Sequence, residues 1–318
     1  MAKTWVGHQS LIPKLTSIIG SSGGAFLFQG PPSTGKRTVA FSMAEAALCE
    51  KSSFDECTCQ SCRAFSVGEH PDFMSIGHLD SIHIEDIDRV LEFASTRPFL
   101  SKKRAVVINN AEEMSVEANN RLLKTIEEPA TGMYFILVTS SPQRLLPTIR
   151  GRCIPVNFDV LSMEDLTNVF WQKMGYELTK ARVLGWVGAG ASFDIFANAG
   201  HVLKYRDEAY NLFADIKKKK LIDCLDLLDR IPNSDVPIFT DLFLIILTDL
   251  LVLKYQGSNI ANVDIQDGLK VCAEEHTIPA LTGVVNSMSQ VKKYRHLNVN
   301  LSATLKAAFI SIYPAMLI

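Results

Sequence analysis

A glycine-rich segment near the N-terminus constrains the fold of this 318-residue chain more than any other feature. It reads Gly30-Pro-Pro-Ser-Thr-Gly35-Lys36-Arg37-Thr38 and keeps both glycines and the lysine of the phosphate-binding pattern G-x-x-x-x-G-K-S/T. An apolar run, Ala25 to Phe28, precedes it, and apolar residues at helical spacing follow it. A loop between a strand and a helix N-terminus offers backbone N–H groups to an anion, so the segment predicts a phosphate-binding loop.

The end of this loop departs from the pattern. Arg37 stands where a serine or threonine hydroxyl normally binds the magnesium that accompanies a nucleoside triphosphate. Thr38 lies one position later, about 100° further round the helix, and is a poor substitute. We therefore expect Gly30, Gly35 and Lys36 to form a degenerate loop that binds ATP and magnesium weakly or not at all.

A second departure follows the apolar run Ala105 to Ile108, which predicts a central parallel strand. In ATPases with a glycine-rich loop, such a strand normally ends in carboxylates that bind magnesium and polarise the attacking water. Here Asn109 and Asn110 follow it, and a neutral amide neither neutralises the metal nor acts as a general base. Glu112 and Glu113 are expected in an exposed first helical turn, so efficient hydrolysis is not expected.

Further strands and helices alternate along the first half of the chain. Phe73 to Ile76 and Tyr134 to Val138 read as strands, and Ile84 to Ala94 and Val116 to Glu128 read as helices. Alternation of this kind predicts a layered α/β domain with a parallel sheet. From Leu221 onward the pattern is helical throughout.

Four cysteines, Cys49, Cys57, Cys59 and Cys62, lie within fourteen residues of a polar, turn-rich stretch. Four thiolates that converge suit a tetrahedral structural zinc ion, which can stabilise a loop with no core of its own. A catalytic zinc is not favoured, because no fourth position would stay open for water. The alternative is four unconnected thiols.

Composition limits the function classes. The 32 basic and 34 acidic residues argue against a protein that coats nucleic acid by bulk charge. The run Lys217 to Lys220 is expected to be a solvated helix face, with a DNA phosphate contact as the alternative. The apolar run Leu242 to Leu253 contains Asp249 and predicts a buried helix rather than a membrane span. Seven cysteines without a secretory signal favour reduced thiols, hence the cytoplasm.

Several motifs together resemble the bacterial DNA polymerase III clamp-loader subunits of the AAA+ class. The glycine-rich loop, the four-cysteine insert with His70-Pro-Asp72 after it, Asn120 to Pro129, and Thr148-Ile-Arg-Gly-Arg152-Cys153 occur in the order of that family. The resemblance covers residues 1 to about 158 by motif and the remainder by length and helical character. Because the nucleotide site has lost its key groups, and Phe193 stands where active members carry an arginine, the chain is similar to the delta prime type of subunit.

This resemblance implies a division of the chain and a set of roles. The family has an AAA+ nucleotide-binding-like domain, here 1–158 with its zinc-binding insert at 49–62, a small helical lid, here 159–208, and an all-helical collar that joins subunits, here 209–318. Arg152 would be an arginine finger for a neighbouring ATPase subunit; the alternative is an arginine that merely pairs with an acidic neighbour, and Arg150 is the less favoured candidate. The partners implied are gamma/tau and delta subunits, the sliding clamp and primed DNA.

Two other functions remain open at this point. An ATP-hydrolysing subunit of the gamma/tau type would use Thr38 and Glu112 in displaced roles. A zinc-bearing interaction protein outside replication would have adopted the same fold. ATP hydrolysis by the chain alone distinguishes the first alternative, and failure to join a clamp-loader pentamer distinguishes the second.

Overall fold

The computed structural model describes residues 5–77, 81–189, 195–293 and 300–317. The chain divides into two compact units, Met1–Leu161 and Ser162–Ile318. Phe193 lies outside the described residues.

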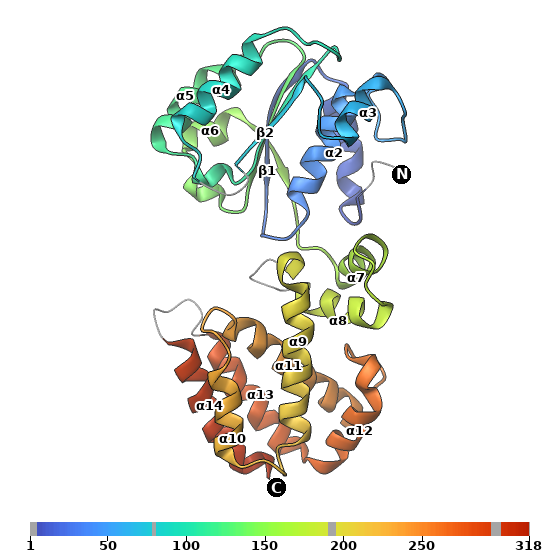
Figure 1. Ribbon diagram of the computed structural model, residues 1–318, viewed down its shortest axis with the longest axis vertical. Coiled ribbons are helices and arrows are strands. Elements are labelled where there is room, and N and C mark those ends of the chain that lie inside the picture. The colour runs from blue at the N-terminus through green and yellow to red at the C-terminus, as the bar shows by residue number, and fades with distance from the viewer. Residues whose placement is uncertain (1–4, 78–80, 190–194, 294–299, 318) are drawn as a thin grey trace. The chain divides into compact units, whose positions relative to one another are not determined.

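The first unit is a parallel sheet of five strands with helices on both faces (Figure 1). The strand order is β2-β3-β4-β1-β5, with every neighbouring pair parallel. Its elements are η1 (Gln9–Leu11), α1 (Ile12–Ile19), β1 (Gly23–Gln29), α2 (Lys36–Leu48), α3 (Gln60–Ser66), β2 (Phe73–Ile76), α4 (Ile84–Ser95), β3 (Arg104–Ile108), η2 (Ala111–Glu113), α5 (Val116–Glu127), β4 (Met133–Thr139), η3 (Pro142–Arg144), α6 (Pro147–Arg152) and β5 (Ile154–Asn157). The predicted α/β fold class is confirmed.

The strand period of two separates the core of this unit into two layers. In β1, Phe26 and Phe28 pack with α1 and α2, whereas Ala25 and Leu27 face α4, α5 and α6. Figure 1 shows α2 and α3 on one side of the sheet and α4, α5 and α6 on the other. All five residues of β3 and all seven of β4 are buried, as expected of central parallel strands.

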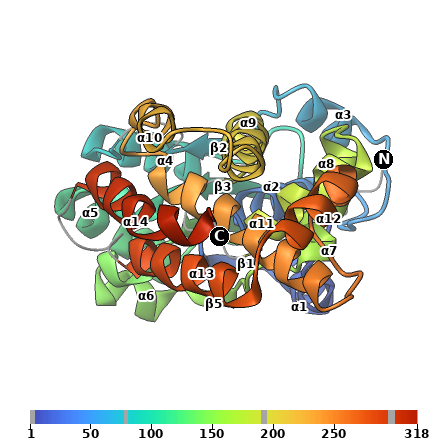
Figure 2. The ribbon, with the colours of Figure 1, turned by 90° about the horizontal axis from the view of Figure 1, so that it is seen from below.

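Within its described residues, the second unit consists of helices joined by turns and loops, with no strand. Its elements are α7 (Met163–Asn168), the π-helical turn η4 (Val169–Lys173), α8 (Leu178–Gly188), α9 (Ile195–Ala214), α10 (Leu221–Asp229), α11 (Val236–Lys254), η5 (Val263–Ile265), α12 (Gln266–Glu275), α13 (Ile278–Lys293) and α14 (Leu301–Met316). Helices α13 and α14 lie side by side (Figures 1 and 2). The expected lid boundary at residue 208 falls inside α9, and the division into lid and collar stays a prediction.

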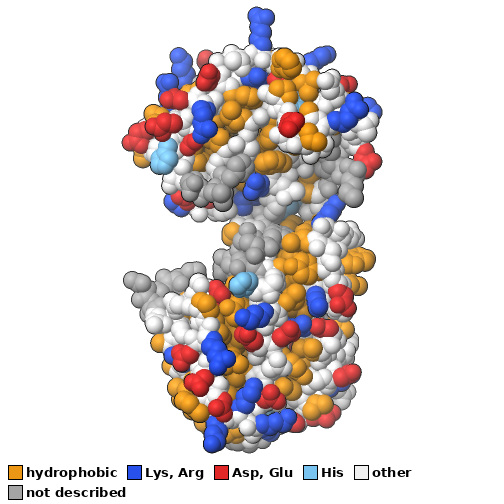
Figure 3. All heavy atoms as spheres, viewed as in Figure 1, with side chains coloured by type: hydrophobic (Ala, Val, Ile, Leu, Met, Phe, Trp, Pro, Cys, Tyr) orange, Lys and Arg blue, Asp and Glu red, His pale blue; other side chains and the backbone are white. Residues whose placement is uncertain are grey.

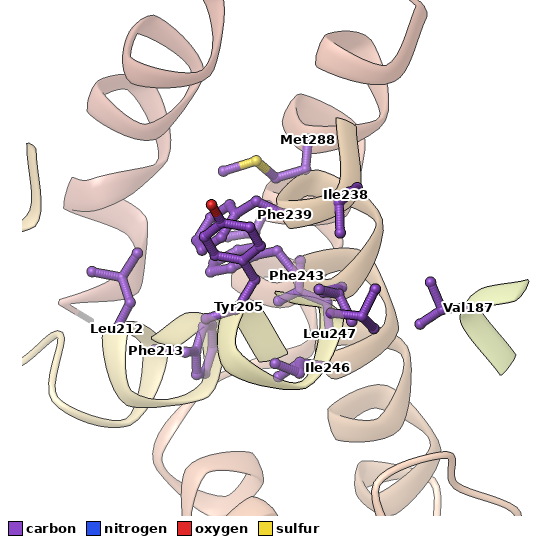
Figure 4. Packing of buried hydrophobic residues seen from close by; sticks show 14 of the residues in the cluster. Val187, Tyr205, Leu212, Phe213, Ile238, Phe239, Phe243, Ile246, Leu247 and Met288 are labelled. Atoms are coloured by element: carbon purple, nitrogen blue, oxygen red, sulfur yellow. The ribbon is translucent and has the colours of Figure 1, made fainter. Parts of the chain in front are cut away.

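One hydrophobic cluster fills this helical unit. Tyr205 and Phe213 of α9 point toward Phe239 and Phe243 of α11, with Met288 of α13 beside them (Figure 4). The ring of Tyr205 meets that of Phe239 edge to face, with centroids 6.3 Å apart. Through these side chains, α11 packs against α9 and α13.

Helix α11 is longer than the apolar run that predicted it. By length and composition alone, its 19 residues are long and apolar enough to cross a membrane. However, 61% of the 18-residue apolar stretch within it is buried inside the unit. Asp249 is buried too, and its carboxylate accepts the backbone N–H groups of Ala261 and Asn262, both at 2.9 Å. A core helix of a soluble protein passes the same length test, so this helix is weak evidence for a membrane span.

Candidate functional site

The glycine-rich loop joins β1 to α2, as the sequence predicts. Gly30 lies where the chain passes close to the end of β5, because a Cβ there would be 2.2 Å from the carbonyl oxygen of Phe158. Gly35 is the N-cap of α2 and has a φ of +78°, a left-handed conformation that favours glycine. Both glycines are therefore required by the backbone of the loop itself.

The side chain of Lys36 folds back onto the glycine-rich loop. Its side chain is 5% exposed, and its Nζ donates to the carbonyl oxygens of Gly30 (2.9 Å) and Pro31 and lies 3.3 Å from the hydroxyl of Thr34. Burial lowers the pKa of Lys36 to about 8, against the opposing effect of the Glu112 carboxylate. The ammonium group thus binds loop carbonyls in the position from which it would otherwise reach a phosphate.

The two residues that follow this lysine lie on the exposed side of α2. Arg37 is exposed, and its guanidinium carbon is 5.4 Å from the ring centroid of Phe41. Thr38 is exposed as well. The position that would supply a magnesium-binding hydroxyl is thus filled by a cation that stacks along the helix.

The two asparagines after β3 are bound to the end of β2. Asn109 is buried, and its Nδ2 donates to Ser75 Oγ and to the Ile76 carbonyl, both at 3.1 Å. Asn110 has a φ of +47°, and its Nδ2 donates to the carbonyl of Gly77 at 3.3 Å. Both amides therefore join β3 to β2 through donor groups that a carboxylate lacks.

Glu112 does not lie in an exposed helical turn, contrary to expectation. It is half-buried in η2, and its Oε1 accepts the backbone N–H of Ser140 at 2.9 Å. Its Oε2 is buried without a hydrogen-bond partner among the described residues. Its neighbour Glu113 forms an exposed ion pair with Arg144 at 2.8 Å. A carboxylate thus lies near enough to Lys36 to raise the pKa of its ammonium group, but not at the strand-end position in which ATPases carry one.

The four cysteines of the insert converge. The Sγ atoms of Cys49, Cys57, Cys59 and Cys62 all lie within 4.8 Å of one another. Sulfurs bound to one zinc ion at about 2.3 Å would be about 3.8 Å apart in a regular tetrahedron, so the four sulfurs need only small shifts. The cluster can hold a metal ion.

Local structure explains how these thiols come together. Cys49 follows the last residue of α2 with an extended backbone, and Cys59 is the N-cap of α3, where its Sγ accepts the N–H of Cys62. Burial alone would raise the pKa of Cys59, but hydrogen bonds from the backbone at Glu50 and Cys62 bring it down to about 7. A thiol whose pKa is lowered loses its proton more readily, and the resulting thiolate is the form that binds a metal ion.

A buried network that the sequence patterns did not predict supports this insert. His70 Nδ1 accepts the N–H of Asp72 at 3.0 Å, so its Nε2 carries the proton that is donated to Ser61 Oγ at 2.8 Å. Ser61 Oγ donates in turn to the carbonyl of Leu48, at the end of α2. The fully buried Asp72 carboxylate accepts backbone N–H groups from three successive residues before β3, Phe99, Leu100 and Ser101.

Arg152 lies in the last turn of α6, directly before β5. Its Nε donates to Glu127 Oε2 at 2.9 Å and its Nη1 to the carbonyl of Thr148 at 3.1 Å. The Arg152 side chain is one-third exposed. Arg150, two positions earlier, is exposed, and its side chain has no ion pair or hydrogen bond within the described part of the chain. Both arginines are accessible, but only Arg152 is held in one orientation.

Three of the four lysines in the run have partners within the described residues. Residues 217–220 lie in the turn between α9 and α10, not on a helix as expected. Lys217 Nζ donates to the Glu275 carbonyl at the end of α12, and Lys218 and Lys219 pair with Asp215. On the face shown in Figure 3, basic and acidic side chains are interspersed.

Comparisons with known proteins point to one family. A family model described as DNA polymerase III, delta subunit, matches residues 8–162. The DNA polymerase III subunit delta' of Bacillus subtilis is 25% identical over 334 residues, which cover 96% of this chain and 97% of that protein. The subunit delta' of Pseudomonas aeruginosa is 33% identical over 135 residues, 41% of each chain.

Other similar proteins match the first half of the chain or its fold. The DNA polymerase III subunit tau of Escherichia coli is 28% identical over 165 residues, 51% of this chain and 26% of that protein. Among solved structures, a DNA polymerase III gamma subunit-related protein from Thermotoga maritima has a TM-score of 0.50 at 17% identity, covering 96% of this chain and 99% of that one.

Proposed function

Because this chain is a DNA polymerase III clamp-loader subunit of the delta prime type, we propose that it serves the active site of a neighbouring subunit rather than one of its own. In this role it would assemble with gamma/tau and delta subunits, help to open the sliding clamp, and load that clamp onto primed DNA. Its relatives are named as subunits of one replication enzyme, which supports membership of such a complex.

The observation that carries this proposal is the state of the chain's own nucleotide site. The residues after β3 are Asn109 and Asn110, whose amide groups are bonded to β2, and the ammonium of Lys36 is bonded to the carbonyls of its own loop. A site without a carboxylate at the strand end has no group that neutralises magnesium or polarises water there. We therefore propose that Gly30, Gly35, Lys36, Arg37 and Thr38 form a loop that does not hydrolyse ATP.

Arg152 is the residue that would act in the neighbour's site. A guanidinium presented across a subunit boundary stabilises the charge on a transferring phosphoryl group, and residues of this type are worth ~10³ to 10⁵ in rate. Its accessibility supports this role, whereas its ion pair with Glu127 is also what the alternative, an arginine that pairs with an acidic neighbour, predicts. We propose Arg152, not Arg150, as the finger.

The test is an assembly reconstituted with gamma/tau and delta subunits of the same organism. Arg152→Ala should lower hydrolysis at the site that this chain faces by ~10³-fold or more, leaving only the turnover of the remaining sites. Arg150→Ala, a matched change two positions away, should leave the rate unchanged. Equal rates for Arg152→Ala and the unmodified chain, with normal assembly, would overturn the proposal.

The cysteine cluster would hold structural zinc in this function. Its four sulfurs occupy all the positions of a tetrahedral ion, so the metal would stabilise the insert and carry out no chemistry. We also propose a cytoplasmic location, because the relatives are named as subunits of a bacterial DNA polymerase. The helical collar at 209–318, which follows the small lid at 159–208 along the chain, would join this subunit to its neighbours, as the resemblance to the family implies.

One observation favours a second candidate, an ATP-hydrolysing subunit of the gamma/tau type. Glu112 lies near enough to Lys36 to affect its pKa, and one of its oxygens is buried without a partner among the described residues. The ATPase activity of the purified chain by itself decides between the two candidate functions. Hydrolysis of ATP that Lys36→Ala abolishes would favour this candidate and exclude the first.

A further inference from the structure

The two residues that hold Arg152 come from different helices. Glu127 is the last residue of α5, which Pro129 follows, and Arg152 is the last residue of α6. Thr148 is one turn before Arg152 in α6 itself, so its carbonyl holds one edge of the guanidinium close to the helix. Glu127 holds the Nε edge from the neighbouring helix. The guanidinium is therefore fixed at two points that belong to two separate elements.

This arrangement leaves a defined part of the guanidinium available. A guanidinium has five N–H donors, one on Nε and two on each terminal nitrogen. Glu127 takes the Nε donor and Thr148 takes one on Nη1, which leaves the second Nη1 donor and both Nη2 donors. Phosphate oxygens are best bound by two parallel N–H groups of this kind. The free edge is the one that a phosphoryl group would require.

The position of Glu127 is unfavourable for helix α5 on its own. An acidic side chain at a helix C-terminus lies near the negative end of the helix dipole. The carboxylate of Glu127 is about half exposed, and ion pairs so exposed contribute little to stability. Stability of the fold thus gives a weak reason for a carboxylate at this position, whereas orientation of Arg152 gives a direct one.

We propose that Glu127 is a positioning residue that orients the Arg152 guanidinium for the neighbouring active site, an inference that rests on the finger role given above. Glu127 would touch neither nucleotide nor metal. It would act through Arg152 alone, by holding Nε while the terminal nitrogens bind the phosphoryl group.

The experiment uses the same reconstituted assembly and a matched pair of carboxylates. Glu127→Ala should lower the maximal rate of the neighbour's ATP hydrolysis by up to about 10²-fold, as expected when a reacting group is displaced by about 1 Å, with KM for ATP and assembly affinity unchanged. Glu127→Gln should restore much of the rate, because its amide oxygen can still accept from Nε. Glu128→Ala is the control, since the Glu128 side chain has no hydrogen bond or ion pair within the described residues and its loss should change nothing.

A double variant shows whether Glu127 acts through Arg152. If it does, adding Glu127→Ala to Arg152→Ala should cause no further loss of rate. A full additional loss in the double variant, or an unchanged rate in Glu127→Ala while Arg152→Ala is impaired, would overturn the positioning role. A normal rate in Arg152→Ala would instead overturn the finger itself, so the two proposals fail in different ways.

Discussion

The imidazole Nε2 of His70 lies 2.8 Å from the hydroxyl oxygen of Ser61, and this contact ties the start of β2 to the helix that carries Cys62. The opposite ring nitrogen already accepts the N–H of Asp72, so a second proton on the ring would have to displace that bond. Burial lowers the pKa of His70, against the opposing effect of the Asp72 carboxylate. The network is therefore built for the neutral imidazole.

The sign of the pH dependence follows from that lowered pKa. Below about pH 6.5 the unfolded chain binds a proton at His70 that the folded chain resists, so stability is present above that pH and is lost as the pH falls. One such group gives a slope of at most about 1.4 kcal/mol per pH unit. We expect the unmodified chain to lose more free energy of unfolding between pH 7 and pH 5 than His70→Gln does. His201→Gln, at an exposed position, should keep the original dependence; identical curves for His70→Gln and the unmodified chain would contradict this account.

Metal content tests the cysteine cluster. The purified chain should retain about one equivalent of zinc after dialysis, because four converging thiolates bind the ion more tightly than free buffer ligands do. Cys59→Ser should lower the zinc content and the thermal stability together. Cys272→Ser, in the helical unit, should leave the metal in place. Less than half an equivalent in the unmodified chain, with all four thiols open to titration, would remove the claim.

The α/β half of the chain could be predicted because its signals are local. The apolar strand β3 and the loop before α2 are fixed by periodicity and by glycines at positions of special backbone geometry. The environment of Glu112 could not be predicted, because it depends on the N–H of Ser140, 28 residues away at the end of β4. Spacing within η2 alone indicated an exposed turn.

The candidate site shows the same limit. The sequence indicates Arg152 by its motif and the four cysteines by their spacing, both of which are short-range patterns. It gives no sign that Glu127 is the partner of Arg152, because the two residues are brought together only when α5 packs beside α6. The lysine run was misjudged for a related reason, since Lys217 is bound to a carbonyl at the end of α12.

Three glycines should respond differently to alanine, because each is glycine for a different reason. Gly151→Ala should stabilise the chain by up to about 1 kcal/mol, since it lies in α6 and a Cβ there meets nothing within 4 Å. Gly35→Ala has equal space but a φ of +78°, and should cost about 1 kcal/mol. Gly30→Ala should cost the most, because its Cβ would overlap Phe158. Thermal unfolding gives the order, and a stabilised Gly30→Ala would show that the loop is not held as described.

Asp249 offers a test of why a helix as apolar as α11 contains a carboxylate. Its oxygens accept the N–H groups of Ala261 and Asn262 and the Nδ2 of Asn262, the last at 2.7 Å. Burial raises the pKa of Asp249, with those hydrogen bonds opposing the shift. Because Asp249→Ala would leave three buried donors without an acceptor, it should lower the free energy of unfolding by about 3 kcal/mol or more.

The neighbouring residue provides the control for this change. Thr248 is exposed, and its hydroxyl donates only to the Leu244 carbonyl of its own helix, so Thr248→Ala should alter stability by no more than about 0.5 kcal/mol. Asp249→Leu would lengthen the apolar run and yet should destabilise as much as Asp249→Ala, because the leucine accepts no hydrogen bond. A more stable Asp249→Leu variant would mean that the carboxylate does not serve to hold the segment at Ala261 and Asn262 in place. Denaturant unfolding of the three variants decides the matter. Added apolar burial would raise the free energy of unfolding, whereas the lost hydrogen-bond acceptor would lower it.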